Sequence, residues 1–273
     1  MIKLSPVKKF QFPVMAYSIT PDAFQEKTLE EIKELEVWEG NTQTTLGELF
    51  KVEEDGEDQS EDADIALQGD LSRVQNIGAK MTQGTITLEG DVGMHLGEEM
   101  RGGKITVKGE VSDWAGSMMR GGTIIIHGDA GHYLAASYRG SERGMRGGKI
   151  IVHGNVGKEA GAYMRKGLIK VYGNADQFAG FRMRRGTIYI QNDCERRAGA
   201  CMKKGKIVVG GVIKSVMPTF TIDAIKKKTK IEKDKKVEGP FYRFLGDLAD
   251  NGRGKLYVKQ EKNSHLSHYE RYL

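Results

Sequence analysis

One short pattern recurs seven times through the middle of the chain and limits what it can fold into. The pattern reads Gly-x-x-Met-x-x-Gly-x-Ile-x-(Leu/Val/Ile)-x-Gly, and six residues usually link one copy to the next. Its methionines lie 19 residues apart, except for one interval of 26. A fixed period of this kind is typical of a repeat protein, in which each copy stacks on its neighbours. The copies occupy residues 78–90, 97–109, 116–128, 142–154, 161–173, 180–192 and 199–211, with Glu142 opening the fourth and Asn192 closing the sixth.

Within each copy, the alternation Ile-x-Val predicts a strand of three to five residues whose side chains point inward and outward in turn. Such a strand is too short to stand alone, but it gains hydrogen bonds on both sides when the copies stack. The 36 glycines fall at fixed spacing, which indicates a backbone that turns at the same place in every copy rather than a disordered segment. The inward positions then form an isoleucine column, Ile86, Ile105, Ile124, Ile150, Ile169, Ile188 and Ile207, and a methionine column, Met81, Met100, Met119, Met145, Met164, Met183 and Met202.

A stacked coil of short strands is the architecture that fits this period. The repeat is too short for helical repeats or a propeller blade, and the signature of leucine-rich repeats is missing. Parallel stacking also goes together with right-handed crossovers. We therefore predict an all-β chain, namely a single-stranded right-handed parallel β-helix of 19-residue coils with mixed α/β flanks.

The predicted organisation has three parts. Residues 1–64 form an N-terminal flank with a short helix, residues 65–211 the β-helix repeat domain, and residues 212–273 a C-terminal capping extension. A degenerate copy at 65–70 is expected to precede the first full repeat. Because both ends of a β-helix expose a strand edge, we expect the flanks to cover these edges.

Local signals predict some structure in the flanks. Residues 28–31, Thr-Leu-Glu-Glu, are typical of a capping box, here opening a helix that runs through Glu36. Residues 45–48 are expected to start another helical turn. The acidic stretch 53–64 is typical of a mobile linker. Asn251-Gly252 predicts a turn, and it follows four apolar residues at helical spacing, Phe241, Phe244, Leu245 and Leu248.

Composition argues against several classes of protein. No run of about 18 apolar residues exists, so no membrane span is expected. The N-terminal residues lack the apolar region and cleavage site of a secretory signal, and two cysteines are too few for a disulfide framework, so we expect a cytoplasmic protein. The formal net charge of +5 is small for the length, and no nucleic-acid partner is expected.

No constellation of catalytic or metal-binding residues emerges from the sequence. His127 and His153 occupy the same position in adjacent copies, but two histidines without a third ligand make an incomplete metal site. Cys194 and Cys201 hold different positions in their copies and are expected to act as small buried hydrophobes. We therefore predict no catalytic, cofactor-binding or metal-binding residue in this chain.

The residue after each methionine is usually a cation. Stacking would place these cations in a column about 4.8 Å apart, which is unfavourable unless acids or a partner compensate. One interpretation is a solvated stripe that pairs internally with Glu98, Glu99, Glu159, Asp176 and Glu195. The other is an interface for an acidic partner surface. The column reads Thr82, Arg101, Arg120, Arg146, Arg165, Arg184 and Lys203.

The interval of 26 residues contains an insertion of seven within residues 136–144. An insertion in a stacked coil becomes a loop on one face, either a tolerated surface loop or a contact loop on a binding face. Together with the cations, it gives the candidate partner interface: Arg101, Arg120, Arg146, Arg165, Arg184, Tyr138, Arg139 and Arg143.

The repeats and a few motifs in the flanks carry a family resemblance that covers nearly the whole chain. The seven repeats resemble those of the C subunit of formylmethanofuran dehydrogenase. They are also similar to the C-terminal β-helix domain of the glutamate synthase large subunit and to the C subunit of the formyltransferase/hydrolase complex. The motifs that carry the resemblance are Met-Arg-Gly-Gly at 100–103, 119–122 and 145–148, Thr-Pro-Asp at 20–22, Val-Trp-Glu-Gly-Asn at 37–41, and Gly-Asp-Leu-Ala at 246–249.

The resemblance implies a function that composition alone does not. It implies a non-catalytic scaffold subunit of the formylmethanofuran dehydrogenase complex, an oxidoreductase that reduces CO2 and forms N-formylmethanofuran in methanogenesis. The implied partners are a molybdopterin subunit, an amidohydrolase-like subunit and ferredoxin-like subunits. Tungsto- or molybdopterin and iron–sulfur clusters would lie in those subunits, with none in this chain. The alternatives are the C subunit of a formyltransferase/hydrolase complex, or a glutamate-synthase-like β-helix domain.

Overall fold

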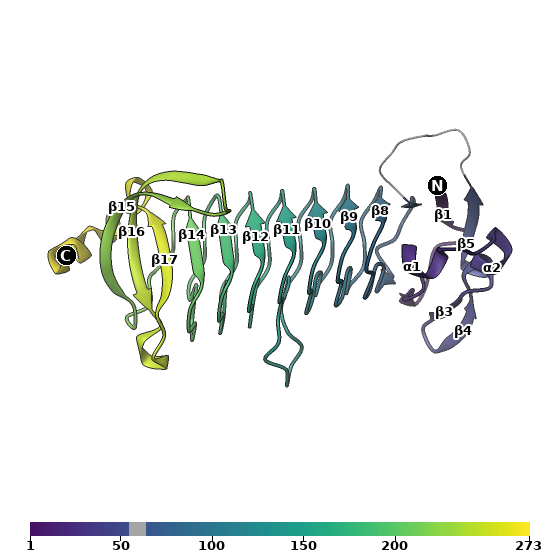
Figure 1. Cartoon of the computed structure of the whole chain (residues 1–273), viewed down its shortest axis with the longest axis horizontal. Coiled ribbons are helices and arrows are strands. Elements are labelled where there is room, and N and C mark those ends of the chain that lie inside the picture. Colours follow the sequence, from purple (N-terminus) through teal and green to yellow (C-terminus); the bar gives the residue numbers. More distant parts are fainter. Residues whose placement is uncertain (55–63) are drawn as a thin grey trace.

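A computed structural model describes residues 1–54 and 64–273 and shows a mostly β protein (Figure 1). Within these residues, a 13-stranded sheet runs in the order β15-β16-β17-β14-β13-β12-β11-β10-β9-β8-β6-β1-β5. No helix in this part of the chain is both long and apolar enough to cross a membrane. The parallel strands in the middle are β6 (Ile65–Leu67), β8 (Thr85–Leu88), β9 (Lys104–Val107), β10 (Thr123–Ile126), β11 (Lys149–Val152), β12 (Leu168–Val171), β13 (Thr187–Ile190) and β14 (Lys206–Val209).

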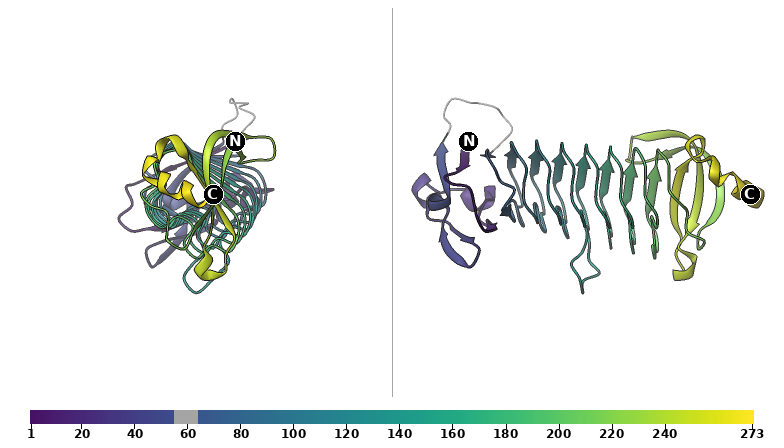
Figure 2. Two further views of the ribbon diagram at one scale, coloured as in Figure 1. Left: turned by 90° about the vertical axis from the view of Figure 1, so that its left-hand side faces the viewer. Right: turned by 180° about the vertical axis from the view of Figure 1, so that it is seen from behind.

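The register of these strands aligns equivalent residues of successive repeats. Ile86 pairs with Ile105, and Ile124 pairs with Ile150 across the seven-residue insertion. Isolated bridges between residues such as Val92 and Val111 form a second line of contacts beyond the turn. The isoleucine and methionine columns are both buried, as predicted, with side chains no more than 1 % exposed. The result is a long parallel sheet of the kind found in β-helix-like folds, and its turns superimpose when viewed along the stack (Figure 2). We call each repeat with its linker a rung.

The turns of each rung depend on glycine where space is missing. Gly116 has a φ of +63°, and a Cβ at this position would lie 2.4 Å from Cδ1 of Ile150, the isoleucine of the next rung. Neither a left-handed backbone nor this close approach suits another residue. By contrast, Gly140 in the insert has a φ of +82° and open space around it.

The N-terminal flank extends the parallel stack and then ends it. The degenerate copy forms β6, as predicted, because Ile65 pairs with Ile86. On its other side β6 pairs in parallel with β1 (Ile2–Pro6), which pairs antiparallel with β5 (Phe50–Glu54). A second sheet of order β4-β3-β2-β7 lies beside this end. Its strands are β2 (Val14–Met15), β3 (Glu36–Glu39), β4 (Thr42–Thr45) and β7 (Val74–Gln75).

Three short helices complete this flank: α1 (Pro21–Phe24), α2 (Leu29–Lys33) and α3 (Leu46–Leu49). The capping box of α2 is confirmed, because Thr28 and Glu31 exchange side-chain-to-backbone hydrogen bonds. The helix ends at Lys33 rather than at Glu36, since Glu36 begins β3 and pairs with Thr45. The predicted helical turn at 45–48 is confirmed as α3. Most of the predicted acidic linker, residues 55–63, lies outside the described residues, and Glu53 and Glu54 belong to β5.

The C-terminal flank covers the other end of the stack. Strand β17 (Gly254–Lys259) pairs in parallel with β14, and it pairs antiparallel with β16 (Lys236–Gly246), which pairs with β15 (Thr221–Lys230). The helical spacing of Phe241, Phe244, Leu245 and Leu248 does not reflect a helix, because the first three lie in β16. Both faces of that strand are covered, so its apolar residues do not alternate strictly and mimic helical spacing. The turn at Asn251, with a φ of +54°, is confirmed, and short 3-10 helices lie at Leu248–Asp250, Gln260–Lys262 and Ser264–Tyr272.

The loop between β15 and β16 folds back over the outer face of the last rungs. Ile231 packs against Tyr189 and Val208, which would otherwise face solvent. Glu232 accepts hydrogen bonds from Nζ of Lys149 at 2.6 Å and from Nζ of Lys170 at 2.5 Å. Lys170 is therefore buried but paired.

Candidate functional site

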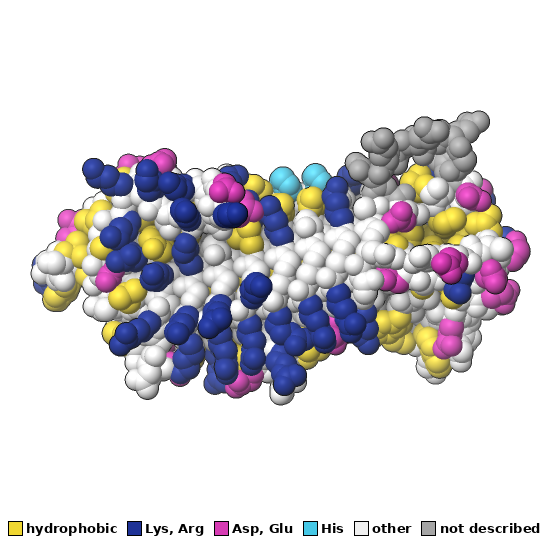
Figure 3. Space-filling model, in the orientation of Figure 1, with side chains coloured by type: hydrophobic (Ala, Val, Ile, Leu, Met, Phe, Trp, Pro, Cys, Tyr) yellow, Lys and Arg dark blue, Asp and Glu magenta, His cyan; other side chains and the backbone are white. Residues whose placement is uncertain are grey.

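The structure brings the predicted cations together in one line. The backbone N–H of Arg101 donates to the carbonyl of Met81 at 2.8 Å, and that of Arg120 to the carbonyl of Met100 at 2.7 Å. The same bond recurs from rung to rung, so the residues after the methionines stack in register. Figure 3 shows a belt of lysine and arginine side chains along the coil, with few acidic side chains among them. We call the line Arg101, Arg120, Arg146, Arg165, Arg184 and Lys203 the cation column.

Acidic side chains compensate this column only in part. Of the acids expected to do so, Glu99 pairs with Arg120, with 2.5 Å between Oε2 and Nη2. Glu98 instead accepts a hydrogen bond from Nδ2 of Asn76. Glu142 pairs with Arg184 at 2.5 Å, a pairing that the repeat pattern did not predict. Among the described residues, the other three expected acids, Glu159, Asp176 and Glu195, form no salt bridge.

Arg146 lies where the column is most crowded. Its Nε is buried and has no hydrogen-bond partner among the described residues. Burial lowers the pKa of Arg146, and the neighbouring charges of Arg120 and Arg143 lower it further. A partly buried guanidinium among like charges is an unfavourable arrangement for the isolated chain.

The insert at 136–144 is anchored to the coil in both directions along the stack. Toward the N-terminus, the hydroxyl of Tyr138 lies 2.8 Å from Nδ1 of His95, and its ring lies 5.0 Å from that of Trp114. Toward the C-terminus, Glu142 reaches Arg184. Figure 1 shows the loop projecting from the stack beside β11. Of its three predicted interface residues, Arg139 and Arg143 are exposed and Tyr138 is half-buried.

Around Tyr138 lies an aromatic cluster that the repeat pattern did not reveal. The rings of Trp114 and Tyr133 stack 4.3 Å apart at 16°, and His95 lies on the other side of Trp114 at 6.4 Å. Burial raises the pKa of Tyr138 and lowers the pKa of His95. His95, Trp114 and Tyr133 lie 19 residues apart and occupy the same position in consecutive rungs. An alignment of the linkers between the repeats therefore predicts that these three rings stack.

The histidines and cysteines weighed in the sequence take other places. His127 and His153 are exposed and stack face to face, with ring centroids 5.0 Å apart at 3°, and Tyr172 continues the line. Cys194 is buried, as predicted, and Cys201 is partly buried.

One group of ligand-type side chains within the described residues lies within metal-binding distance: Cys201, Asp247 and Asp250. The carboxylate of Asp247 already accepts hydrogen bonds from the backbone N–H groups of Cys201 and Ala249. Asp250 pairs with Lys203 at 3.5 Å. This group is therefore engaged in holding the C-terminal flank against the coil.

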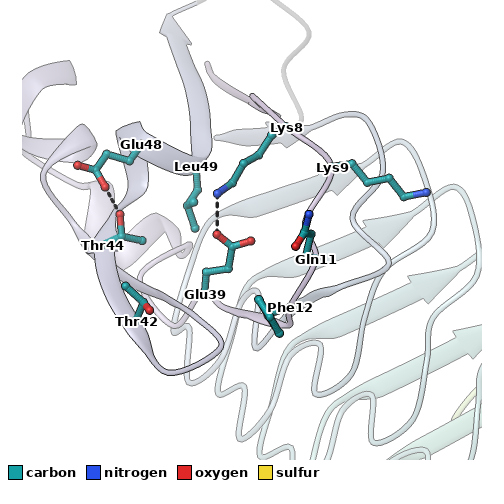
Figure 4. A pocket seen from close by; sticks show the side chains of 9 residues that line it. All are labelled: Lys8, Lys9, Gln11, Phe12, Glu39, Thr42, Thr44, Glu48 and Leu49. Carbon is teal, nitrogen blue, oxygen red and sulfur yellow. Dashed lines mark hydrogen bonds and ion pairs between the residues drawn. The ribbon is translucent and has the colours of Figure 1, made fainter.

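A cavity of about 550 Å³ lies in the N-terminal flank (Figure 4). Nζ of Lys8 and Oε2 of Glu39 meet in it at 2.7 Å, and Thr44 donates to Glu48. Phe12 borders the cavity and is 59 % exposed. The two carboxylates that line this cavity, Glu39 and Glu48, are both engaged by neighbouring side chains.

Several known proteins are similar to this chain, although no protein-family model matches it. The C subunit of the molybdenum-containing formylmethanofuran dehydrogenase 1 of Methanothermobacter marburgensis is 44 % identical over 93 residues, which are 34 % of this chain and 22 % of that protein. The C subunit of the tungsten-containing formylmethanofuran dehydrogenase 2 of Methanothermobacter wolfeii is 40 % identical over 95 residues, 35 % of each chain. The matched part thus spans about a third or less of these relatives.

A likeness over the whole length comes from a solved structure. One chain of the formyltransferase/hydrolase complex from Methylorubrum extorquens, determined with methylofuran, superimposes with a TM-score of 0.83 and 29 % identity. The superposition covers 94 % of this chain and 99 % of that one. Together these findings confirm the resemblance predicted from the repeats.

Proposed function

We propose that this chain is a non-catalytic scaffold subunit of a formylmethanofuran dehydrogenase complex, which reduces CO2 and forms N-formylmethanofuran in methanogenesis. The observation that carries this proposal is the sequence similarity of about a third of the chain to the C subunits of both the molybdenum and the tungsten enzymes. In the described residues, the group of ligand-type side chains Cys201, Asp247 and Asp250 is engaged with the backbone and with Lys203. A rigid stack that presents a charged face suits a scaffold.

The chemistry would then belong to other chains of the complex. We infer that tungsto- or molybdopterin and iron–sulfur clusters reside in a molybdopterin subunit and in ferredoxin-like subunits, next to an amidohydrolase-like subunit. A cytoplasmic location fits the two unpaired cysteines, Cys194 and Cys201.

The finer description of the fold is also part of the proposal. We infer a right-handed parallel β-helix of 19-residue coils, organised as residues 1–64, 65–211 and 212–273. The pairing of Ile86 with Ile105 and of Ile105 with Ile124 supports the period. The near-universal handedness of parallel crossovers supports the right hand.

The cation column and the insert are the surface that we assign to a partner. Incomplete pairing in the column, and the buried, partnerless Nε of Arg146, support an acidic partner surface that completes the charge balance. The residues assigned to this interface are Arg101, Arg120, Arg146, Arg165, Arg184, Tyr138, Arg139 and Arg143.

A specific observation favours a second candidate. The chain from the formyltransferase/hydrolase complex matches over nearly its full length, whereas the dehydrogenase relatives match over about a third or less. The second candidate is therefore the C subunit of a formyltransferase/hydrolase complex, with the same scaffold role.

Affinity purification of the tagged chain from its native cells tests both candidates. Co-elution of subunits with tungsten or molybdenum and CO2-reducing activity supports the first. Co-elution of formyltransferase activity without these metals supports the second. Elution of the chain alone, at its own mass of 30.3 kDa, contradicts both.

The same purification tests the assigned interface. Arg120→Glu with Arg146→Glu should release the partners, because two charges of the column are reversed. A matched control, Lys227→Glu with Lys228→Glu, reverses two charges in β15, away from the column, and should retain them. Equal retention by both variants contradicts the assignment.

A further inference from the structure

Every rung places a residue other than glycine, at one equivalent position, in a backbone conformation that favours glycine. The φ at this position lies between 60° and 67°, and in most rungs the residue directly before the methionine is left-handed as well. Glycine adopts this left-handed conformation without strain and asparagine tolerates it, whereas aromatic residues rarely adopt it. Only the first rung uses asparagine. We call this line the left-handed ladder: Asn76, His95, Trp114, Tyr133, Glu159, Phe178 and Arg197.

The strain in the ladder is unnecessary for the turn itself. Glycines in the same rungs, such as Gly116 and Gly180, adopt the same conformation. Glycine at the ladder position would therefore build the same turn at lower conformational cost. Side chains held in strained conformations concentrate at sites where the side chain has a task.

Part of the ladder already has an occupant, supplied by the insert of the same chain. Tyr138 packs against His95 and Trp114, and its hydroxyl contacts Nδ1 of His95. Four residues further along the insert, Glu142 pairs with Arg184 at 2.5 Å and lies 4.0 Å from Arg182. The insert thus shows which chemistry this face accepts, namely a segment with an aromatic ring and a carboxylate close together, here on either side of a turn in which the Ser141 N–H donates to the Tyr138 carbonyl.

The C-terminal part of the ladder carries matching groups, of which the insert reaches only Arg182, through Glu142 at 4.0 Å. The guanidinium of Arg197 lies 5.1 Å from the ring centre of Phe178, and that of Arg182 lies 5.5 Å from Phe181. Phe178 and Phe181 meet edge to face at 5.8 Å. Both arginines are exposed, and Arg197 forms no salt bridge within the described part of the chain. Arginine held against aromatic rings is typical of the centre of a protein interface.

We propose that this patch, Phe178, Phe181, Arg182 and Arg197, binds an acidic segment of a partner subunit. Carboxylates of that segment pair with Arg182 and Arg197, since guanidinium groups bind carboxylates through two parallel hydrogen bonds. Its apolar or aromatic residues cover the two phenylalanine rings. The patch adjoins the cation column, because Glu142 contacts both Arg182 and Arg184. The inference rests on the proposed role as a subunit of a complex and specifies one contact within it.

Replacement by glycine separates binding from folding. The full-length tagged chain carrying Phe178→Gly and Arg197→Gly is purified from native cells, and retention of partner subunits is quantified. We expect retention to fall at least ten-fold, while the melting temperature of the isolated chain stays equal or rises because strain is relieved. The control His127→Ala with His153→Ala removes a stacked, exposed pair on another face and should leave retention unchanged. If the melting temperature falls instead, Arg197→Glu decides: it keeps the rings and must also release the partners.

A second measurement distinguishes failure of this inference from failure of the proposed function. A labelled random copolymer of glutamate and tyrosine is titrated onto the isolated chain and followed by fluorescence anisotropy. Wild type should bind at least ten-fold more tightly than the double glycine variant. If the wild-type chain elutes alone from cells but still binds the copolymer more tightly than the variant, the proposed complex is contradicted and the proposed binding patch is supported. If partners and copolymer bind the variant as well as they bind wild type, the proposed patch is contradicted and the proposed complex is supported.

Discussion

The isoleucine column and the left-handed ladder have the same spacing along the stack, but the residue type is constant in the first and varies in the second. At the inward position of each strand, all seven full rungs use isoleucine, and every one is buried. At the ladder position the rungs use asparagine, histidine, tryptophan, tyrosine, glutamate, phenylalanine and arginine. The backbone is equivalent from rung to rung in both lines, so the difference comes from the surroundings. Close packing admits one shape, whereas most ladder positions are half-buried or exposed and admit several. The variety in the ladder therefore reflects what each side chain contacts.

The largest expected effect tests the uniform column against its neighbour on the same strand. Ile150 in β11 is fully buried, while Ile151 points outward and is partly exposed. Ile150→Ala should lower the free energy of unfolding by about 2–5 kcal/mol, because it leaves a cavity between two isoleucines. Ile151→Ala should lower it by less than about 1 kcal/mol. Urea unfolding of both variants measures the difference, and equal midpoints would mean that the column does not carry the stability.

The second prediction concerns the turns beside the column. Gly116→Ala combines a left-handed backbone with a contact at Cδ1 of Ile150, so it should destabilise the chain by about 2–4 kcal/mol. Gly140→Ala has the backbone strain alone, in open space, and should cost about 1 kcal/mol. Thermal unfolding compares them. A loss for Gly140→Ala as large as that for Gly116→Ala would show that the column leaves more room than its geometry indicates.

The third prediction tests the outer face where the chain itself covers it. Hydrogen bonds from Lys149 and Lys170 hold the pKa of Glu232 below its usual range. The stabilisation is therefore present above the pKa of an unfolded glutamate and is lost as the pH falls through the folded pKa. Glu232→Gln should lower stability by about 1–2 kcal/mol at neutral pH, because Lys170 stays buried without its ion pair.

The pH dependence provides the control for this ion pair. The stability of wild type should fall between about pH 5 and pH 3, and that of Glu232→Gln should fall less over the same range. Parallel curves for the two proteins would indicate that Glu232 does not contribute through its charge. Thermal unfolding at each pH gives the measurement.

The smallest expected effect falls on the cation column. Arg146→Met removes a desolvated charge that has no hydrogen-bond partner at Nε, so stability should stay within about 1 kcal/mol of wild type or rise. Arg120→Met loses the pair with Glu99 and should fall slightly, by up to about 1 kcal/mol. Denaturant midpoints of both variants decide. A clear loss for Arg146→Met would make the column part of the folding core rather than a contact surface.

The 19-residue period predicted the elements that every repeat contains, but it could not predict the elements of the two flanks, which lack the repeat. The columns, the strands and the line of cations follow from a spacing that any stacked rung must keep. The parallel strands β1 and β17 carry no copy of the pattern, because Ile2 pairs with Ile65 and Lys255 with Lys206 only after the flanks fold back. Phe241 and Phe244 fall at helical spacing although they lie in a strand. A strand that is covered on both faces does not need to alternate apolar and polar residues.

The candidate interface was predicted in its charges and missed in its aromatic part. Each arginine of the column follows a methionine that marks its place, so its position could be counted. The ladder has a constant conformation but no constant residue, and a search for recurring letters passes over it. Glu142 was noted only as an exception to the motif, although its pairing with Arg184 is what joins the insert to the column.

The uninterrupted pairing of Thr123 with Lys149 across the insertion has a consequence for distance. Each strand adds about 4.8 Å to the length of the stack, whatever its loops contain. The distance between the two ends is therefore set by the number of rungs. Deletion of residues 161–179, which also removes Lys170 and Phe178, would bring the two ends of the molecule closer by one strand spacing and would move Arg197 toward the insert. The number of repeats would therefore determine the distance between two partners bound at the two ends.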